Sequence, residues 1–200
     1  MSYWFYISKA FSCLVSTVLG FLYMLLWGIR FSLPVYFFGL PKFFKSRKGK
    51  IVLGKNIRLN SNYSSNLAGT WHPVSISAIG AGVIEIGNNT GISSSVIIAK
   101  KHIKIGDDVR IGVGCTICDT DFHPVDYKER MILQQEEKKA EVIIEDGVFL
   151  GMHTIVLKGV TIGKRSVIGA GSVVTKSIPP DVIAAGCPAK IIGHINVDKQ

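Results

Sequence analysis

The fold is decided by residues 144–174, whose sequence is IEDGVFLGMHTIVLKGVTIGKRSVIGAGSVV. An aliphatic residue recurs there at every sixth position: Ile144, Leu150, Val156, Ile162, Ile168 and Val174. This period matches neither the 3.6-residue repeat of an amphipathic helix nor the two-residue alternation of a half-buried strand. A short fixed period indicates a solenoid, in which each turn buries its apolar face against the neighbouring turns. We therefore predict a coil with three sides, each about six residues long, and one inward aliphatic residue on each side.

The same ladder runs earlier in the chain, as Ile86, Ile92 and Ile98 and again as Ile105, Ile111 and Ile117. Glycine, or a pair such as Asp107-Asp108, follows many of these aliphatic residues. Gly, Asn and Asp adopt turn conformations at little steric cost, so we place the corners of the coil there. Residues 51–83 keep the period poorly and are predicted to form imperfect first coils.

The period breaks over residues 119–141, which begin Asp119-Thr120-Asp121-Phe122-His123-Pro124. The mixed charges in this stretch indicate a solvated, adjustable loop that leaves the coil and returns to it. His123 is the strongest candidate for chemistry in the chain, because an imidazole titrates near neutral pH and can act as a general base.

The net charge of +9 is unevenly distributed. Residues 1–84 contain nine Lys/Arg and no Asp/Glu, whereas residues 85–200 contain fourteen of each. Such asymmetry indicates either nucleic acid or an anionic membrane surface as a partner. Residues 10–29 decide between them, because they are twenty consecutive uncharged residues, enough for about 30 Å of helix. We therefore predict that residues 1–50 are a hydrophobic and basic membrane-associated segment and that the chain binds no nucleic acid.

Two topologies remain open for this segment. If residues 10–29 span the bilayer, the basic cluster between Lys42 and Lys50 faces the cytoplasm and the N-terminus lies outside. If the chain breaks at Pro34 and re-enters, both ends are cytoplasmic. A cleaved signal peptide fits less well, because the first residues are nearly uncharged. Both topologies place the remaining domain on the cytoplasmic face of the inner membrane.

The four cysteines are too few and too scattered for a disulfide framework. Cys115-x-x-Cys118 has no second pair to complete a zinc site, so we interpret it as two packed, reduced thiols. This usage indicates a reducing compartment.

Four segments together carry a resemblance to a known family: GVFLG at 147–151, GVTIG at 159–163, VIGAGSVV at 167–174 and AGCPAK at 185–190. They resemble the hexapeptide-repeat acyltransferases, and most closely the galactoside/maltose acetyltransferase and polysaccharide O-acetyltransferase branch. The resemblance implies a mainly β fold, a left-handed parallel β-helix over residues 51–193, with 194–200 as a C-terminal tail. It also implies a homotrimer that binds acyl-CoA in the groove between neighbouring β-helices.

The activity implied by the resemblance is acetyl-CoA-dependent O-acetylation of a glycan hydroxyl, without a metal. The membrane segment favours a lipid-linked sugar or a surface-polysaccharide intermediate as the acceptor. In such an enzyme His123 is the catalytic base, and Gly151 and the amide of Met152 lie at the thioester. The path of CoA is implied to follow Ala170, Thr175, Lys176 and Lys190. Lys190 stands where relatives more often have arginine, which gives a point charge in place of a bidentate phosphate contact.

Acceptor binding is less well defined by the resemblance. The asparagine that relatives use for the acceptor corresponds to Ile92 in this chain, so the neighbouring Ser93 and Ser94 are the substitutes. Asp121 stands two residues before His123 and is expected either to orient it or to bind a sugar hydroxyl, because alternation in an extended segment puts both side chains on one side.

Three alternatives are kept. The same fold would suit an N-acetyltransferase acting on an amino sugar. It would also suit a metalloenzyme similar to β-helical carbonic anhydrases, which needs three histidines on a zinc-like ion, a spacing that this chain does not show. The third alternative is a non-catalytic membrane scaffold.

Overall fold

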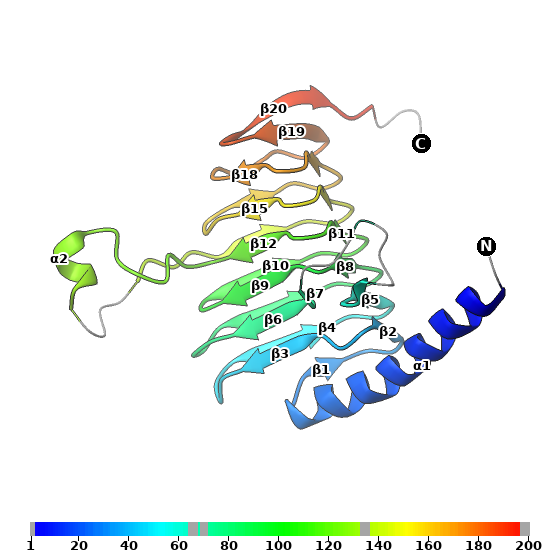
Figure 1. Cartoon of the computed structure of the whole chain (residues 1–200). Helices are drawn as coiled ribbons and strands as arrows, with labels where there is room; N and C mark the ends of the chain where they lie inside the picture. Colours follow the sequence, from blue (N-terminus) through cyan, green and yellow to red (C-terminus); the bar gives the residue numbers. More distant parts are fainter. Residues whose placement is uncertain (1–2, 64–67, 69–71, 133–136, 197–200) are drawn as a thin grey trace.

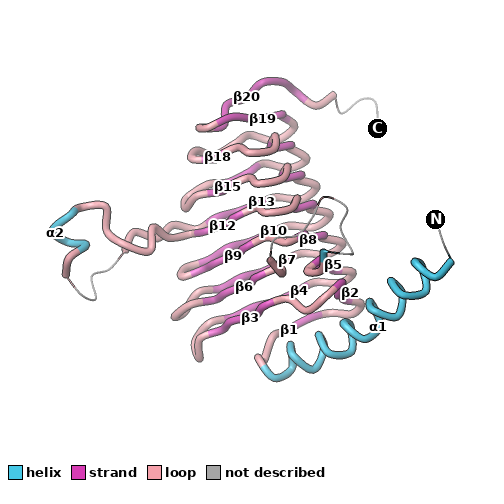
Figure 2. The backbone as a smooth tube through the Cα atoms, in the orientation of Figure 1, coloured by secondary structure: helices cyan, strands magenta, loops and turns pink. Residues whose placement is uncertain are grey.

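The computed structural model describes residues 3–63, 68, 72–132 and 137–196, with side chains from residue 13 onward. A helix at the N-terminus, α1 (Tyr3–Leu26), lies beside one end of a tall stack of short strands (Figure 1). The chain winds up this stack as a solenoid, and one long excursion leaves it halfway along (Figure 2).

The strands form three sheets, and the pairing within each is parallel except for the last pair of sheet B. Sheet A contains β1 (Arg30–Phe31), β4 (Lys50–Leu53), β7 (Val83–Ile86), β10 (His102–Ile105), β13 (Val142–Ile144) and β16 (Thr161–Ile162). Sheet B contains β2 (Val35–Phe38), β5 (Ile57–Asn60), β8 (Gly91–Ser93), β11 (Arg110–Ile111), β14 (Phe149–Leu150), β17 (Val167–Ile168), β19 (Val182–Gly186) and β20 (Ala189–His194). Sheet C contains β3 (Lys42–Lys45), β6 (Ser75–Ala78), β9 (Val96–Ala99), β12 (Thr116–Cys118), β15 (Ile155–Val156) and β18 (Val173–Val174). Three parallel sheets wound in this order are consistent with the predicted left-handed β-helix.

The aliphatic ladder forms the core of the solenoid. The six residues from Ile144 to Val174 are all fully buried, each stacked on its equivalent in the coil below or above. One earlier position differs from the prediction: Ile97 is buried and pairs with Ile117, whereas Ile98 is only half-buried. The corner between β8 and β9 is one residue shorter than the period requires, so the inward position moves from Ile98 to Ile97.

The solenoid begins at Arg30, and the predicted domain boundary at residue 51 is corrected accordingly. The strands β1, β2 and β3 pair with β4, β5 and β6, so the described strands between residues 51 and 83 belong to regular coils. Val35, Phe37 and Phe43 point inward and are buried. The six-residue period is absent here because longer connections interrupt it, including residues 61–74 between β5 and β6.

Of the predicted membrane-associated segment, residues 1–50, the structure describes only Tyr3–Leu26 as helix. Within the described residues, no helix is both long and apolar enough for a membrane span. The helix does not reach Pro34, where the re-entrant alternative places its break: it ends at Leu26, and the chain from Arg30 forms strands of the first coil. The helix closes the apolar end of the solenoid, where Met24 is fully buried and the ring of Phe21 meets that of Phe37 edge-on.

Two edges of the solenoid position the candidate site. Each edge is a stack of corners from successive coils, and we name it by the two sheets that its corners join. The C-to-A edge contains the turns that follow the sheet C strands, and residues 119–141 leave the solenoid there, between β12 and β13. They include the short helix α2 (Tyr127–Arg130), far from α1 in Figure 1. The B-to-C edge contains the turns that follow the sheet B strands, among them Gly151-Met152-His153 between β14 and β15.

Candidate functional site

The excursion leaves and rejoins the solenoid through two paired segments, residues 119–121 and 138–140, which we call the neck. An antiparallel bridge joins Thr120 to Lys139 there. Backbone hydrogen bonds join Asp121 N to Lys138 O at 3.1 Å and Ala140 N to Asp119 O at 2.9 Å. These bonds hold both ends of the excursion together as they leave the solenoid, so the residues just beyond the neck start from a fixed point.

Asp119 anchors this neck from inside. Its fully buried carboxylate accepts the backbone N–H groups of Lys100 at 2.8 Å and Lys101 at 2.7 Å, in the turn of the coil below. Those two donors lie where the coil turns from β9 to β10, so the carboxylate satisfies both groups. Asp119 therefore fixes the start of the excursion to the coil below.

His123 lies immediately beyond the neck and is exposed. The preceding residue, Phe122, has a φ of 63°, which turns the chain sharply, and its N–H is held by Thr120 Oγ1 at 3.1 Å. The Lys100 ammonium lies 5.6 Å from the centre of the Phe122 ring and fixes it against the solenoid. No hydrogen bond or ion pair joins the imidazole of His123 to any described residue, so both ring nitrogens are available to a substrate.

Asp121 does not orient His123. Its carboxylate accepts from the Lys158 ammonium at 2.6 Å, which ties the neck to the next coil. The expected alternation fails because Phe122 is left-handed rather than extended, so residues 121 and 123 do not share a face. Lys158 was not identified from the sequence, since nothing local connects it to a residue 37 positions earlier.

The residues implied at the thioester lie on the other corner. Gly151 and Met152 form the turn after β14, and Ala170 occupies the equivalent position after β17. A Cβ on Gly151 would lie 2.6 Å from the backbone nitrogen of Ala170, so this stack of turns is too tight for a side chain at that position. The N–H groups of Met152 and Ala170 donate no hydrogen bond to another described residue. Two unused backbone donors, one coil apart, fit the carbonyl and amide oxygens of an acyl-CoA chain.

The structure thus divides the predicted site between two edges of sheet C. His123, Thr175 and Lys176 lie at the C-to-A edge. Gly151, Met152, Ala170, Ser93 and Ser94 lie at the B-to-C edge, as does Lys190, which pairs with Ala185 in the closing hairpin. A strand of sheet C separates the two edges by roughly 15 Å. His123 and Met152 of one chain therefore do not face each other across a shared site.

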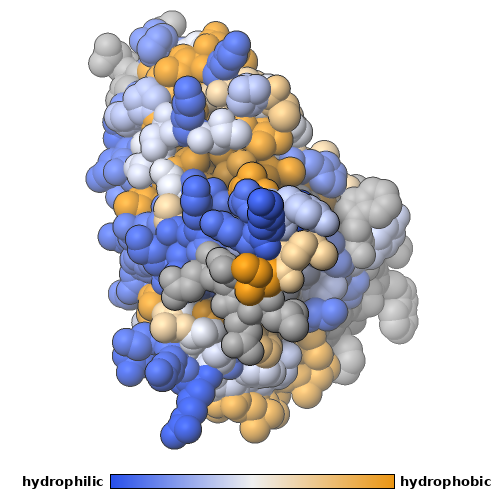
Figure 3. Space-filling model, turned by 90° about the vertical axis from the view of Figure 1, so that its left-hand side faces the viewer, coloured by the Kyte–Doolittle hydropathy of each residue, from blue (hydrophilic) through white to orange (hydrophobic). Residues whose placement is uncertain are grey.

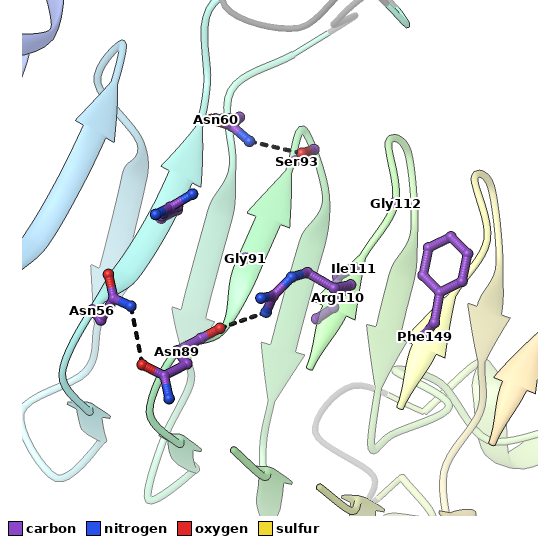
Figure 4. Close-up of a pocket in the computed structure, with 10 residues that line it drawn as sticks. Asn56, Asn60, Asn89, Gly91, Ser93, Arg110, Ile111, Gly112 and Phe149 are labelled. Atoms are coloured by element: carbon purple, nitrogen blue, oxygen red, sulfur yellow. Dashed lines mark hydrogen bonds between the residues drawn. The ribbon is translucent and has the colours of Figure 1, made fainter. Parts of the chain in front are cut away.

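A hollow of about 450 Å³, lined by polar side chains and by Phe149, adjoins the B-to-C edge on the outer face of sheet B (Figure 4). Gly91 leaves a gap between Arg58 and Arg110, which pair with it from either side. Ser93 lines the hollow and accepts from the Asn60 amide at 3.0 Å, and Gly112 at its margin lies against Met152 N. Hydroxyl, amide and guanidinium groups over an open surface match the polar groups of a sugar chain. The sequence suggested only Ser93 here, because the hollow combines residues from four coils.

Ser94 stabilises the turn between β8 and β9 and does not line the hollow on sheet B. Its side chain is buried and donates to His72 O, while its φ of 43° makes the turn from β8 to β9. The Ser94 hydroxyl is therefore used within the chain, and its expected role in acceptor binding stays a prediction.

The cysteines of the Cys115-x-x-Cys118 pair are free and buried. Burial raises the pKa of both thiols above the ordinary value. Cys115 Sγ donates to Gly151 O at 3.2 Å, so it supports the turn at the B-to-C edge. In the described part of the chain, no group of three His, Cys, Asp or Glu side chains is arranged to hold a metal ion.

Comparison with known proteins places these features in context. Residues 141–176 match the family model described as bacterial transferase hexapeptide (six repeats). The galactoside O-acetyltransferase of Escherichia coli is 41% identical over 114 residues, covering 56% of this chain and 55% of that protein. A solved galactoside acetyltransferase in complex with coenzyme A is 41% identical, covers 56% of each chain and has a TM-score of 0.53. The polySia-specific acetyltransferase NeuO is 27% identical with a TM-score of 0.69, covering 85% of this chain and 74% of that one.

The chain spans about half the length of the curated relatives it matches. The predicted resemblance is confirmed: residues 141–176 match the hexapeptide transferase model, and the chain is similar to galactoside and maltose O-acetyltransferases. The comparison with NeuO also extends over most of the described solenoid.

Proposed function

We propose that this hexapeptide-repeat chain is an acetyl-CoA-dependent O-acetyltransferase that modifies a glycan. The observation that carries the proposal is His123, exposed and without a partner among the described residues, directly beyond a neck that hydrogen bonds hold rigid. A general base must be fixed in place and must have a free nitrogen for the acceptor hydroxyl. The similarity to acetyltransferases, one of them solved with coenzyme A, supports acetyl transfer as the reaction.

In the proposed reaction, acetyl-CoA supplies the acetyl group as a thioester. The neutral imidazole of His123 accepts the proton of the acceptor hydroxyl while that oxygen forms a bond to the acetyl carbon. The Met152 N–H, which has no partner among the described residues, stabilises the negative charge on the carbonyl oxygen. When the carbon–sulfur bond breaks, the imidazolium returns its proton to the thiolate, so His123 ends neutral.

We further propose that the active form is a homotrimer with each site shared by two subunits. Within one chain the base and the backbone donors lie on opposite edges of sheet C, so a single chain does not assemble the reaction. A neighbour packed beside the solenoid brings its B-to-C edge to the C-to-A edge of the first chain. Three such contacts close a cyclic trimer, in which every subunit contributes to two sites.

The proposed acceptor is a glycan with negatively charged groups. Arg58 and Arg110 flank the gap at Gly91, and neither forms an ion pair within the described chain. The Arg58 guanidinium lies 6.0 Å from the Tyr36 ring centre, and Arg110 Nη1 is held by Asn89 O at 2.5 Å. Guanidinium groups bind carboxylates in a bidentate manner. The polySia specificity named for NeuO supports an acidic polymer as the class to test first.

The test of the reaction is thiol release from acetyl-CoA by the full chain, measured with acidic and neutral glycans and with amino sugars. We expect release with an acidic glycan and a mass gain of one acetyl ester on the product. His123→Ala should lower kcat/KM at least about 10²-fold. His194→Ala is the matched control, an exposed histidine in β20 that should leave the rate unchanged.

Three other outcomes would contradict part or all of the proposed reaction. Equal rates for His123→Ala and the wild type would contradict the assignment of the base. Transfer to amino sugars alone, giving an amide that resists mild alkali, would replace O-acetylation with N-acetylation. No thiol release with any acceptor, together with no coenzyme A binding, would favour the scaffold alternative.

A further inference from the structure

The outer face of α1 is apolar and has no covering in the described chain. The helix buries one side against the first coil, where Gly20 contacts the ring of Phe37 and Tyr23 meets Phe43. The opposite side exposes seven aliphatic residues in little more than three turns: Leu14, Val15, Val18, Leu19, Leu22, Leu25 and Leu26. Leu26 is 85% exposed. Contiguous apolar surface of this kind marks an interaction site.

The apolar surface continues from α1 onto the first coil. Leu19, Leu22 and Leu26 line a shallow hollow together with Leu40 and Pro41, in the turn between β2 and β3. Figure 3 shows hydrophobic residues gathered at the lower end of the molecule, with strongly hydrophilic side chains beside them. The face is therefore formed by helix and solenoid together and has a fixed shape.

A cationic surface adjoins this apolar one. Five side chains gather in a second hollow, directly after the end of α1: Arg30, Lys45, Arg47, Lys48 and Lys50. None of the five forms an ion pair with a described residue. The sequence offers no acid before Glu85, so nothing in this part of the chain neutralises them.

We propose that α1 lies in the plane of an anionic lipid surface, with its leucine face among the acyl chains and the five cations on the headgroups. Apolar helix surface beside unpaired Lys and Arg is the combination that binds such an interface. The charges argue against a second copy as the occupant, because two such faces would bring ten like charges together.

In-plane binding of α1 also sets the distance between the lipid surface and His123, and the meaning of that distance for the acceptor rests on the proposed function. The excursion with His123 leaves after β12, three strands along sheet C from β3. At about 4.8 Å per strand, the base lies roughly 15 Å along the solenoid from the first coil. The reacting hydroxyl would then belong to a sugar several units away from a lipid anchor.

The experiment is flotation of the full chain with phosphatidylcholine vesicles, with and without phosphatidylglycerol. We expect binding to the anionic vesicles, weakened by salt. Leu22→Asn/Leu26→Asn keeps the net charge and should reduce binding about tenfold or more, whereas Val125→Asn in the excursion should not. Arg47→Gln/Lys48→Gln should reduce binding to anionic vesicles only, and Lys128→Gln/Arg130→Gln is its control.

Alkaline carbonate should release the bound protein from the vesicles, since an in-plane helix is held less firmly than a span. Retention after carbonate would overturn the in-plane arrangement. Unchanged binding in Leu22→Asn/Leu26→Asn, with the same thermal midpoint as the wild type, would overturn the role of this face. Absence of vesicle binding, with a larger wild-type assembly that the leucine variant dissociates, would show that a second copy covers the helix. Because no step of this test depends on acetyl transfer, its failure is separable from failure of the proposed reaction.

Discussion

The two edges of sheet C are built from different chemistry. The C-to-A edge depends on charged side chains: the buried Asp119, the Asp121–Lys158 pair and the Lys100–Glu137 pair at 3.1 Å. The B-to-C edge depends on glycines and backbone groups, with turns stacked so closely that Gly151 has no room for a side chain. One edge can move a proton and the other can donate to an oxygen, and acetyl transfer needs both. This difference between the edges is why we assign the proposed reaction to two neighbouring chains.

The sharpest test of this division is complementation between two inactive variants. His123→Ala disables the C-to-A edge, and Ala170→Trp, at an exposed position, blocks the B-to-C edge without disturbing the core. When the two variants are co-expressed equally and assemble at random, about a quarter of all sites would combine an intact His123 with an intact turn from the neighbour. We expect each variant alone to be nearly inactive and the mixture to recover about a quarter of the wild-type rate. No recovery in trimers shown to be mixed would place the whole site within one chain.

Gly151→Ala tests how closely the B-to-C turns are stacked. The new methyl group would meet the backbone of Ala170, which cannot rotate away, so we expect the free energy of unfolding to fall by about 2–3 kcal/mol. Gly171→Ala is the matched control: it has open space but a φ of 70°, and should cost only about 1 kcal/mol. Denaturant unfolding measures both. Equal losses would contradict the tight stacking at Gly151, because its backbone conformation, unlike that of Gly171, does not require glycine.

Asp119→Ala tests the corresponding foundation of the C-to-A edge. It leaves the N–H groups of Lys100 and Lys101 without their acceptor, at an expected cost of about 2 kcal/mol in unfolding free energy. Loosening the neck should also lower kcat through misplacement of His123. Asp126→Ala removes a carboxylate that caps the exposed helix α2 and should cost about 1 kcal/mol or less. A loss no larger for Asp119 than for Asp126 would contradict the anchoring role.

Lys158→Met removes the ion pair with Asp121 while keeping the length of the side chain. Both groups are partly exposed, so we expect the unfolding free energy to fall by less than about 1 kcal/mol. Activity should decrease only a few-fold, because the backbone bonds of the neck remain. The rate of limited proteolysis within the excursion measures how far Lys158→Met loosens the neck. Lys164→Met, in the turn between β16 and β17, is the control variant. A loss of activity as large as that of His123→Ala would mean that Lys158 itself takes part in the reaction.

The smallest expected effect concerns the thiols. Cys187 is exposed, whereas burial protects Cys115 and Cys118 and raises their pKa, so little thiolate is present near neutral pH. We expect a disulfide reagent to label Cys187 within minutes and the buried pair only after unfolding. Rapid labelling of Cys115 would show that the B-to-C turns open readily, against the tight stacking inferred from Gly151.

Local patterns in the sequence predicted much of this molecule. The ladder from Ile144 to Val174 predicted a solenoid because inward positions repeat at a fixed interval along the chain. The interruption at 119–141 identified the excursion and His123 by the same logic. The first coil was missed because β2 and β3 have aromatic residues on both faces, the exposed Tyr36 and Phe44 beside the buried Phe37 and Phe43. No period therefore distinguishes the inward positions, and the composition resembles a membrane segment.

By itself, the sequence determined the core, the excursion and the charge asymmetry. Each of these depends on residues that are adjacent in the chain or that recur at one fixed spacing. Only the tertiary structure decided which side chains meet across coils: Asp121 with Lys158 rather than His123, Asp119 with the turn below, and Arg58 with Arg110 around Gly91. It also placed His123 and Met152 on opposite edges of a sheet. Such contacts depend on how many residues each corner contains, and a corner can gain or lose a residue without changing the aliphatic pattern that buries the core.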